Sequence, residues 1–177
     1  MKKILFPIGL LFLLSPACQN TRTGLSPEVT IPVSQVFNEA SRYVDRLVAV
    51  EGMVIHVCRE SGKRLFLGEE QFKVLASDKI GKFKVTLEGS DIRAAGYIRE
   101  EKIDENYLDD WEKELSAGAK VQVKEAVHTH EAEARGEDEN AISTQLKQIQ
   151  GYRDQIAASE KGYLSFYSLE VVDIQEK

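Results

Sequence analysis

The stretch Leu47–Cys58 reads LVAVEGMVIHVC, and this pattern decides the expected fold. Five of its side chains share one parity: Val48, Val50, Val54, His56 and Cys58. In an extended chain alternate residues point to the same side, so the stretch predicts a β-strand with one apolar face. Gly52 lies in its middle, where we expect a bulge or a sharp bend.

Further strands are predicted on either side of a hairpin turn. Ser61-Gly62-Lys63 is typical of such a turn. The predicted strands are Arg64–Leu67, Gln71–Ala76, Asp91–Glu101 and Tyr163–Ile174. Asp78–Phe83 is expected to form one turn of helix or a loop, and Gly96 to bend the strand that contains it.

Three segments have helical spacing instead. Ser34 is a plausible N-cap for a helix whose apolar face is Val36, Phe37, Ala40 and Val44. A second helix is predicted from the spacing of Leu108, Trp111 and Leu115, and a third from Ile142, Leu146, Ile149, Arg153 and Ile156. Between them, residues 128–140 have almost no apolar side chain except alanine, which is typical of a solvated helix or a loose loop.

This order of elements predicts a mostly β fold with added helices. Four short strands followed by a distant fifth suit a five-stranded barrel of the OB-fold type. The helical segment, about residues 104–161, would be an insertion before the last strand. A β-sandwich or an open α+β sheet is the alternative.

The first residues predict export across a bacterial membrane. Lys2 and Lys3 precede an apolar run, Ile4–Leu14, which is too short to span a bilayer, and Ala17 supplies a small residue before Cys18. We expect residues 1–17 to be a signal peptide and Cys18 to be lipidated. The alternative is ordinary cleavage that leaves a free thiol at Cys18. Residues 18–32 then form a tether to a single domain, 33–177.

Charge limits the partners of this chain. Its formal net charge is −6, which argues against a general affinity for nucleic acid. The charge is also uneven, because seven Lys and Arg face four acids in segment 56–84, while six face fourteen in segment 99–139. These segments are either two solvated faces or a basic groove half covered by an acidic arm. If Cys18 carries lipid, Cys58 is left without a partner for an intramolecular disulfide.

The motif Val50–Cys58 followed by Ser61-Gly62-Lys63-Arg64 resembles a set of exported bacterial lipoproteins that have an OB-fold and no assigned function. In that family a strand of the form V-x-G-x-V-x-H-V-C leads into a G-K-[KR] turn. The resemblance covers about Val33 to Glu114, including Leu87–Ile92 and Glu105–Leu108, with a weaker echo in Tyr163–Val172. It implies the fold and the membrane anchor, and it carries no catalytic residue.

A fainter likeness is to the haem chaperone of cytochrome c maturation, another membrane-tethered OB-fold. Its haem-attaching histidine precedes a segment that resembles Asp104-Glu105-Asn106-Tyr107. Ile103 occupies the place of that histidine here, so haem attachment does not carry over.

Two clusters contain metal-binding residue types. His56 and Cys58 are two apart on a predicted strand and could share an ion of zinc or copper with a third ligand. The alternative is a half-buried histidine and an inert buried cysteine. His128, His130, Glu131 and Glu133 form the second cluster, for which the alternative is a solvated acidic arm.

A third candidate site is basic. Arg59, Lys63 and Arg64 flank the first hairpin, where OB-folds bind oligonucleotides or oligosaccharides. Phe66 and Phe72 are either stacking platforms for such a ligand or core residues. Asp109 and Asp110 look like exposed acids at the start of a helix.

Because no catalytic motif is recognisable, the sequence predicts a non-enzymatic binding or interaction module anchored in the cell envelope. We predict no cofactor. The expected partners are the membrane, through the lipid on Cys18, and an envelope protein or glycan; nucleic acid is not expected. The alternative is a metal- or redox-handling envelope protein that uses His56 and Cys58.

Overall fold

The computed structural model describes residues 26–117 and 139–177. The predicted signal peptide, Cys18, and the cluster of His128, His130, Glu131 and Glu133 lie outside these residues. Among the helices that the structure does describe, none is long and apolar enough to cross a membrane.

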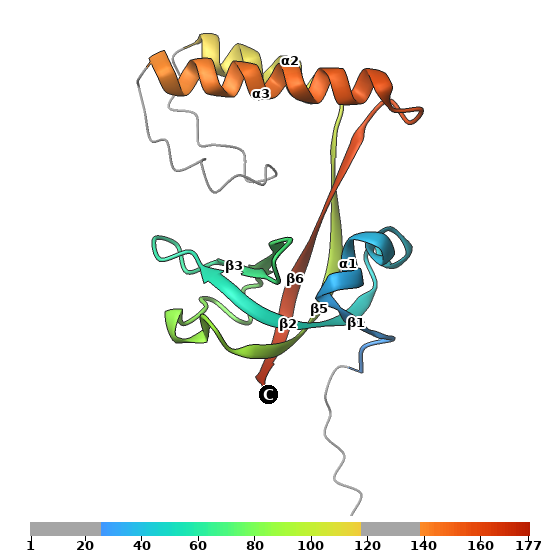
Figure 1. Cartoon of the computed structure of the whole chain (residues 1–177), viewed down its shortest axis with the longest axis vertical. Helices are drawn as coiled ribbons and strands as arrows, with labels where there is room; N and C mark the ends of the chain where they lie inside the picture. Colours follow the sequence, from blue (N-terminus) through green and yellow to red (C-terminus); the bar gives the residue numbers. More distant parts are fainter. Residues whose placement is uncertain (1–25, 118–138) are drawn as a thin grey trace, which may run out of the picture.

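Five strands close into a mixed β-barrel (Figure 1). They are β2 (Leu47–Val57), β3 (Arg64–Leu67), β4 (Phe72–Ala76), β5 (Asp91–Ile103) and β6 (Leu164–Glu176). Their order is β2-β3-β4-β6-β5, and β5 pairs again with β2 to complete the ring. Only β4 and β6 are parallel within the ring. The predicted OB-fold-like barrel is confirmed, and the closing β2–β5 pair rules out a sandwich or an open sheet.

A sixth strand extends the sheet at its start. β1 (Thr30–Pro32) runs parallel to β2, with Thr30 opposite Ala49. These three residues were expected in the tether, so the folded part begins earlier than predicted. Extended residues beside an open strand edge pair with it because their backbone groups otherwise lack partners.

The first helix also differs from its prediction. α1 (Val33–Glu39) has Pro32 at its N-cap rather than Ser34, and a 3-10 turn, η1 (Ala40–Tyr43), follows it. Proline suits a helix start because its fixed φ and missing N–H cost little there. Val44 leaves the helix to form a bridge with Ile98 of β5, a tertiary contact that the spacing of apolar residues does not reveal.

The alternation along β2 holds only as far as Val54. A bulge between Val54 and His56 shifts the register, so Val57 is buried while the His56 side chain is 36% exposed. We expected the bulge or bend at Gly52, but the bulge lies further along the strand. Gly52 instead leaves room for α1, because a Cβ there would lie 2.6 Å from Cγ1 of Val33.

β5 and β6 form a long ribbon that leaves the barrel and carries the remaining helices (Figure 1). At Gly96, where we expected a bend, β5 has a bulge between Ala95 and Gly96. Beyond the barrel, Ile103 pairs with Leu164, and α2 (Glu105–Ser116) and α3 (Glu139–Ala158) connect the two strands. Between β4 and β5 lies one further 3-10 turn, η2 (Val85–Leu87).

The described residues form two hydrophobic cores. The first fills the barrel and includes Phe72, Leu65 and Leu169. The second holds α2 and α3 against the ribbon, and its buried members are Ile103, Leu108, Trp111, Leu115, Ile149 and Ile156. The predicted apolar faces of both helices are confirmed at these positions, whereas Leu146 is 39% exposed.

Candidate ligand-binding end of the barrel

Two loops that are distant in sequence meet at one end of the barrel. The first, residues 58–63, joins β2 to β3, and the second, residues 77–84, follows β4. The Phe83 N–H donates to the carbonyl of Gly62 over 2.7 Å, and the Ala76 N–H donates to that of Lys63 over 2.9 Å. Gly62 has a φ of 64°, and a Cβ there would lie 3.3 Å from Cβ of Lys82. These contacts hold the two loops side by side.

Each loop brings cations to this end. The group consists of Arg59, Lys63, Arg64, Lys79, Lys82 and Lys84, which we call the cationic end. All are exposed except Arg64, which is half-buried. The prediction had named only the first three. The excess of basic residues in segment 56–84 pointed to Lys79, Lys82 and Lys84 as well. It could not show that these three are exposed while Lys73, in the same segment, is buried on β4.

One carboxylate organises the edge of the cationic end. Glu88 accepts a hydrogen bond of 2.9 Å from the backbone N–H of Val57, and its oxygens lie 3.2 Å from Nδ1 of His56 and 3.8 Å from Arg59. The Val57 hydrogen bond is the main cause that lowers the pKa of Glu88; burial opposes it, and the charges of Arg59 and His56 add to it. Glu88 therefore remains ionised and offsets part of the charge of Arg59.

The four lysines of this group are not neutralised in the same way. In the described part of the chain, no carboxylate lies within ion-pair distance of Lys63, Lys79, Lys82 or Lys84. Folding thus concentrates positive charge at one end of a protein whose net charge is negative.

The two aromatic candidates, Phe66 and Phe72, lie in different surroundings. Phe72 is fully buried and meets Phe37 edge to face, with ring centroids 5.5 Å apart, so it is a core residue. Phe66 faces outward from β3, is half-buried, and stacks on the His56 ring at 6.3 Å and 18°. A stacking role for Phe72 is therefore wrong, whereas Phe66 lies beside the cationic end.

Cys58 lies just past the end of β2 and is buried. Its sulfur accepts a hydrogen bond from the Ser61 hydroxyl over 3.5 Å. Burial acts to raise the pKa of the Cys58 thiol, but the Ser61 hydroxyl and the backbone N–H groups of Ser61 and Glu60, with Arg64, outweigh it and lower the pKa. The turn after β2 thus favours the thiolate.

His56 is paired with Glu88, a partner that the sequence did not indicate. Among the described residues, no group of three or more His, Cys, Asp and Glu is placed to hold an ion. Binding of zinc or copper by His56 and Cys58 stays a prediction.

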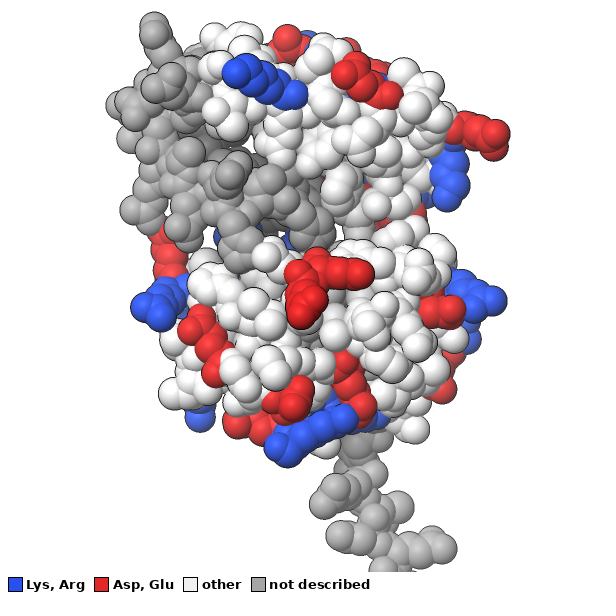
Figure 2. Space-filling model, in the orientation of Figure 1, with Lys and Arg blue, Asp and Glu red and all other residues white. Residues whose placement is uncertain are grey.

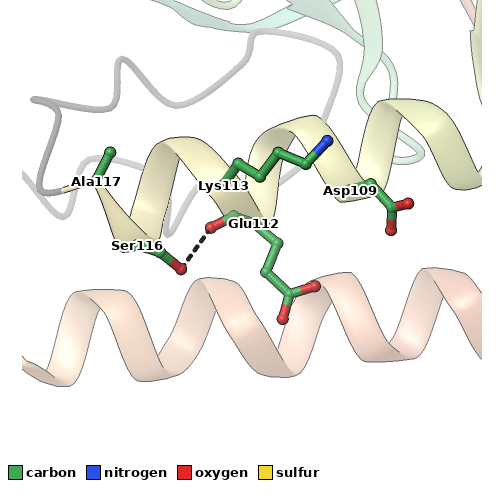
Figure 3. Close-up of a pocket in the computed structure, with 5 residues that line it drawn as sticks. All are labelled: Asp109, Glu112, Lys113, Ser116 and Ala117. Carbon is green, nitrogen blue, oxygen red and sulfur yellow. Dashed lines mark hydrogen bonds between the residues drawn. The ribbon is translucent and has the colours of Figure 1, made fainter.

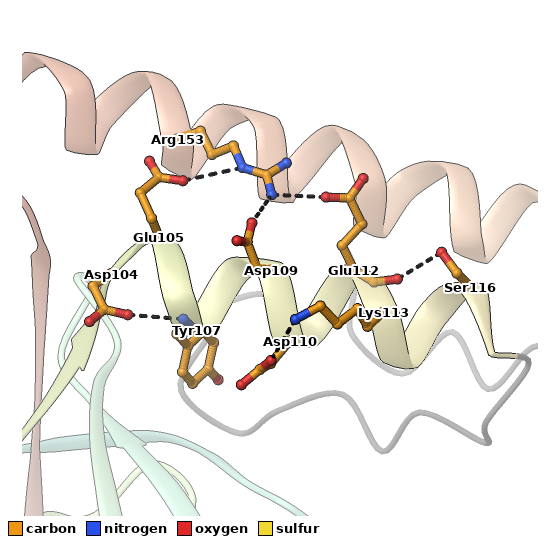
Figure 4. Close-up of polar contacts among 9 residues, drawn as sticks. All are labelled: Asp104, Glu105, Tyr107, Asp109, Asp110, Glu112, Lys113, Ser116 and Arg153. Atoms are coloured by element: carbon orange, nitrogen blue, oxygen red, sulfur yellow. Dashed lines mark hydrogen bonds and ion pairs between the residues drawn. The ribbon is translucent and has the colours of Figure 1, made fainter.

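An open hollow lies on α2, away from the cationic end (Figure 3). It is lined by Asp109, Glu112, Lys113, Ser116 and Ala117. Asp109 and Glu112 are held by Arg153 of α3, at 2.7 and 2.8 Å (Figure 4), and the Ser116 hydroxyl donates to the carbonyl of Glu112. The carboxylates of this hollow therefore join the two helices.

Charge is mixed on the face of the molecule that Figure 2 draws. On the face shown in Figure 2, basic and acidic side chains are interspersed, and much of the surface is uncharged. The described residues thus combine a closed OB-fold-like barrel with cations on two adjacent loops and at the start of β3.

Comparisons with known proteins add little to this description. No protein-family model matches the chain, and no curated protein matches it. Among solved structures, it is similar to one described as a "putative aspartyl-tRNA synthetase from Leishmania major Friedlin", at a TM-score of 0.38 and 14% identity. The alignment covers 92% of this chain and 23% of that protein. A TM-score of this size establishes no shared fold, so nothing is carried over.

Proposed function

We propose that this protein is a non-enzymatic lipoprotein of the bacterial cell envelope that binds its partner at the cationic end of an OB-fold-like barrel. The lipid on Cys18 would anchor it, and the barrel would present the site. The observation that carries the proposal is the presence of five exposed cations on two loops that backbone hydrogen bonds tie together, with Arg64 beside them at the start of β3.

The anchor part rests on the first eighteen residues. The short apolar run, the small Ala17 and the following Cys18 are typical of a lipoprotein signal. We expect the protein in a bacterial host to incorporate an alkyne-labelled fatty acid and to sediment with membranes. The Cys18→Ser variant should lose both properties. A wild-type chain that is exported but carries no lipid would contradict the anchor.

The binding part is tested in intact cells with a photo-crosslinking amino acid at position 63 or, as a control, at position 147. Lys63 belongs to the cationic end, whereas Lys147 is exposed on α3. We expect crosslinks to an envelope component from position 63 and few from position 147. Equal crosslinking from the two positions would show that the cationic end is not the site.

A second function, handling of a metal or of thiol redox state, is favoured by one observation. The hydrogen bonds around Cys58 stabilise its thiolate, which is the form that binds zinc or copper. Native mass spectrometry of the protein purified without chelator or metal resin tests this function. A bound ion that is present in the wild type and absent in Cys58→Ala would support this second function. A metal-free wild type would contradict metal binding and leave the binding module as the remaining proposal.

A further inference from the structure

We propose that the partner of the cationic end is an acidic polysaccharide, a linear chain of sugars that carries a carboxylate or phosphate on each repeat. This inference rests on the proposed function and names the chemistry of its ligand. It is carried by the number of the cations and by their placement on two adjacent loops and at the start of β3.

The balance of charge at this end is positive. The two loops carry five cations, and Arg64 at the start of β3 adds a sixth, while the acids beside them are Glu60, Asp78 and Glu88. Glu88 is already engaged by Val57, His56 and Arg59. A ligand here must therefore bring negative charge, because gathering like charges on a folded surface is unfavourable until an anion neutralises them.

The cations come from two separate loops rather than from a single turn. Arg59 and Lys63 lie on one loop, and Lys79, Lys82 and Lys84 follow one another along the second. A single phosphate or carboxylate contacts two or three such groups. A polymer that carries a charge on each repeat can run along both loops and meet them in turn, so that several weak contacts add up.

The cationic end is separate from the place where the described chain enters the barrel. The chain enters the barrel beside the start of β2, where the Glu28 N–H donates to the carbonyl of Leu47 and β1 runs parallel to β2. The cationic end lies past the other end of β2, at Cys58. Eleven residues of extended strand place the two ends roughly 35 Å apart. The cationic end and the place where the described chain enters the barrel thus lie at opposite ends of β2.

The overall charge favours a glycan over nucleic acid. The chain has a net charge of −6, and twenty-nine acids act against twenty-three Lys and Arg. A duplex presents dense charge to a wide surface and is repelled by such a protein, whereas a single polysaccharide strand needs only the local cationic end. Export, as proposed above, places the protein among glycans.

Isothermal titration calorimetry of the full chain, purified from membranes in neutral detergent, tests the inference. The probes are polygalacturonate, monomeric galacturonate, the uncharged polymer dextran and a single-stranded oligothymidylate. The site variant carries both Lys63→Glu and Lys82→Glu. The control variant carries Lys147→Glu, a charge reversal on α3. Milder Lys63→Gln and Lys82→Gln changes serve if the charge reversals unfold the protein, as judged by circular dichroism.

We expect wild type to bind polygalacturonate and to bind neither monomeric galacturonate nor dextran measurably. The charge reversals should weaken binding about tenfold or more, while Lys147→Glu should stay within about twofold. Added salt should weaken binding of the wild type.

Three results would overturn the inference: no heat with polygalacturonate, equal binding by the site variant and wild type, or tighter binding of oligothymidylate than of polygalacturonate. Persistent crosslinks from position 63 in cells would then show that the binding module stands and that only the class of ligand is wrong. Loss of those crosslinks as well would mean that the proposed function has failed.

Discussion

Arg153 of α3 donates a hydrogen bond of 2.8 Å to the carboxylate of Glu112 on α2, and the same guanidinium contacts Asp109 at 2.7 Å and Glu105 at 3.3 Å (Figure 4). The three acids are spaced i, i+4 and i+7, so they lie along one face of α2. A single cation thus holds together three like charges and joins the two helices.

Removal of this cation should loosen the helical pair. In Arg153→Met the three carboxylates of α2 repel one another without compensation, so we expect the pair to unfold at a lower temperature. Trp111, the single tryptophan, is fully buried between the helices and reports this event by its fluorescence. Salt should reduce the difference from wild type, because it screens the repulsion.

Lys113→Met is the control for that change. Lys113 contacts Asp110 at 3.3 Å within α2, and both side chains are largely exposed. Exposed pairs of this kind contribute little, so the melting temperature should hardly move. Equal effects of the two variants would mean that Arg153 does not join the helices.

A second prediction concerns Gly96. A Cβ at this position would collide with the backbone carbonyl of Glu170 on β6, where the bulge brings the strands close. We expect Gly96→Ala to destabilise the protein by about 1–3 kcal/mol, since backbone must move to admit the methyl group. Chemical denaturation measures the change.

Gly151→Ala provides the matched comparison. Gly151 lies within α3, and nothing is within 4 Å of a Cβ placed there. Alanine favours a helix over glycine by about 1 kcal/mol, so this variant should be more stable than wild type. A Gly96→Ala variant as stable as wild type would show that β5 and β6 are less closely packed than described.

A third prediction concerns Tyr107, at the junction of the ribbon and α2. Burial, assisted by the charges of Glu101 and Glu114, raises the pKa of the Tyr107 hydroxyl to about 12. In the unfolded chain the group titrates at its ordinary value of about 10. As the pH rises from about 10 to about 12, the unfolded chain gives up this proton first, so the free energy of unfolding should fall.

Ultraviolet titration of tyrosinate measures this pKa. The wild-type curve minus that of Tyr107→Phe should show one group that titrates near pH 12, and the variant should lose less stability in alkaline solution. A difference curve centred near pH 10 would mean that the Tyr107 hydroxyl is not shielded from water.

A fourth prediction concerns the thiol at the turn after β2. Because the Ser61 hydroxyl donates to Cys58, Ser61→Ala should raise the pKa of the thiol and slow its alkylation at neutral pH. The rate is followed with iodoacetamide against pH in a Cys18→Ser background. Ser116→Ala, which removes a hydroxyl from α2, should leave the profile unchanged. An unchanged profile in Ser61→Ala would assign the lowered pKa to other groups.

The local patterns were sufficient for the class of fold. The alternation around Val48, Val50 and Val54 predicted the central strand, and the helical spacing of Leu108, Trp111 and Leu115 predicted the buried face of α2. Both patterns record which side of one element faces apolar surroundings, and that information lies in neighbouring residues. The closed OB-fold-like barrel follows from the order of such elements.

The candidate site was predictable only in part. The hairpin supplied Arg59, Lys63 and Arg64, because a turn places its neighbours together. The contribution of Lys82 depends on a hydrogen bond between Phe83 and Gly62, two residues from different loops. The partner of His56 was missed for the same reason, since Glu88 lies thirty-two positions away in the sequence.

The sequence by itself determined the expected export signal, the strands and helices and their buried faces, because each depends on composition or spacing within a short segment. Only the tertiary structure decided that β1 pairs with β2 and that His56, beside a bulge, contacts Glu88. It also decided that Arg153 contacts three acids of α2 and that two loops with basic side chains lie next to each other. Each of these depends on pairing between segments far apart in the chain, and no local pattern specifies the register of that pairing.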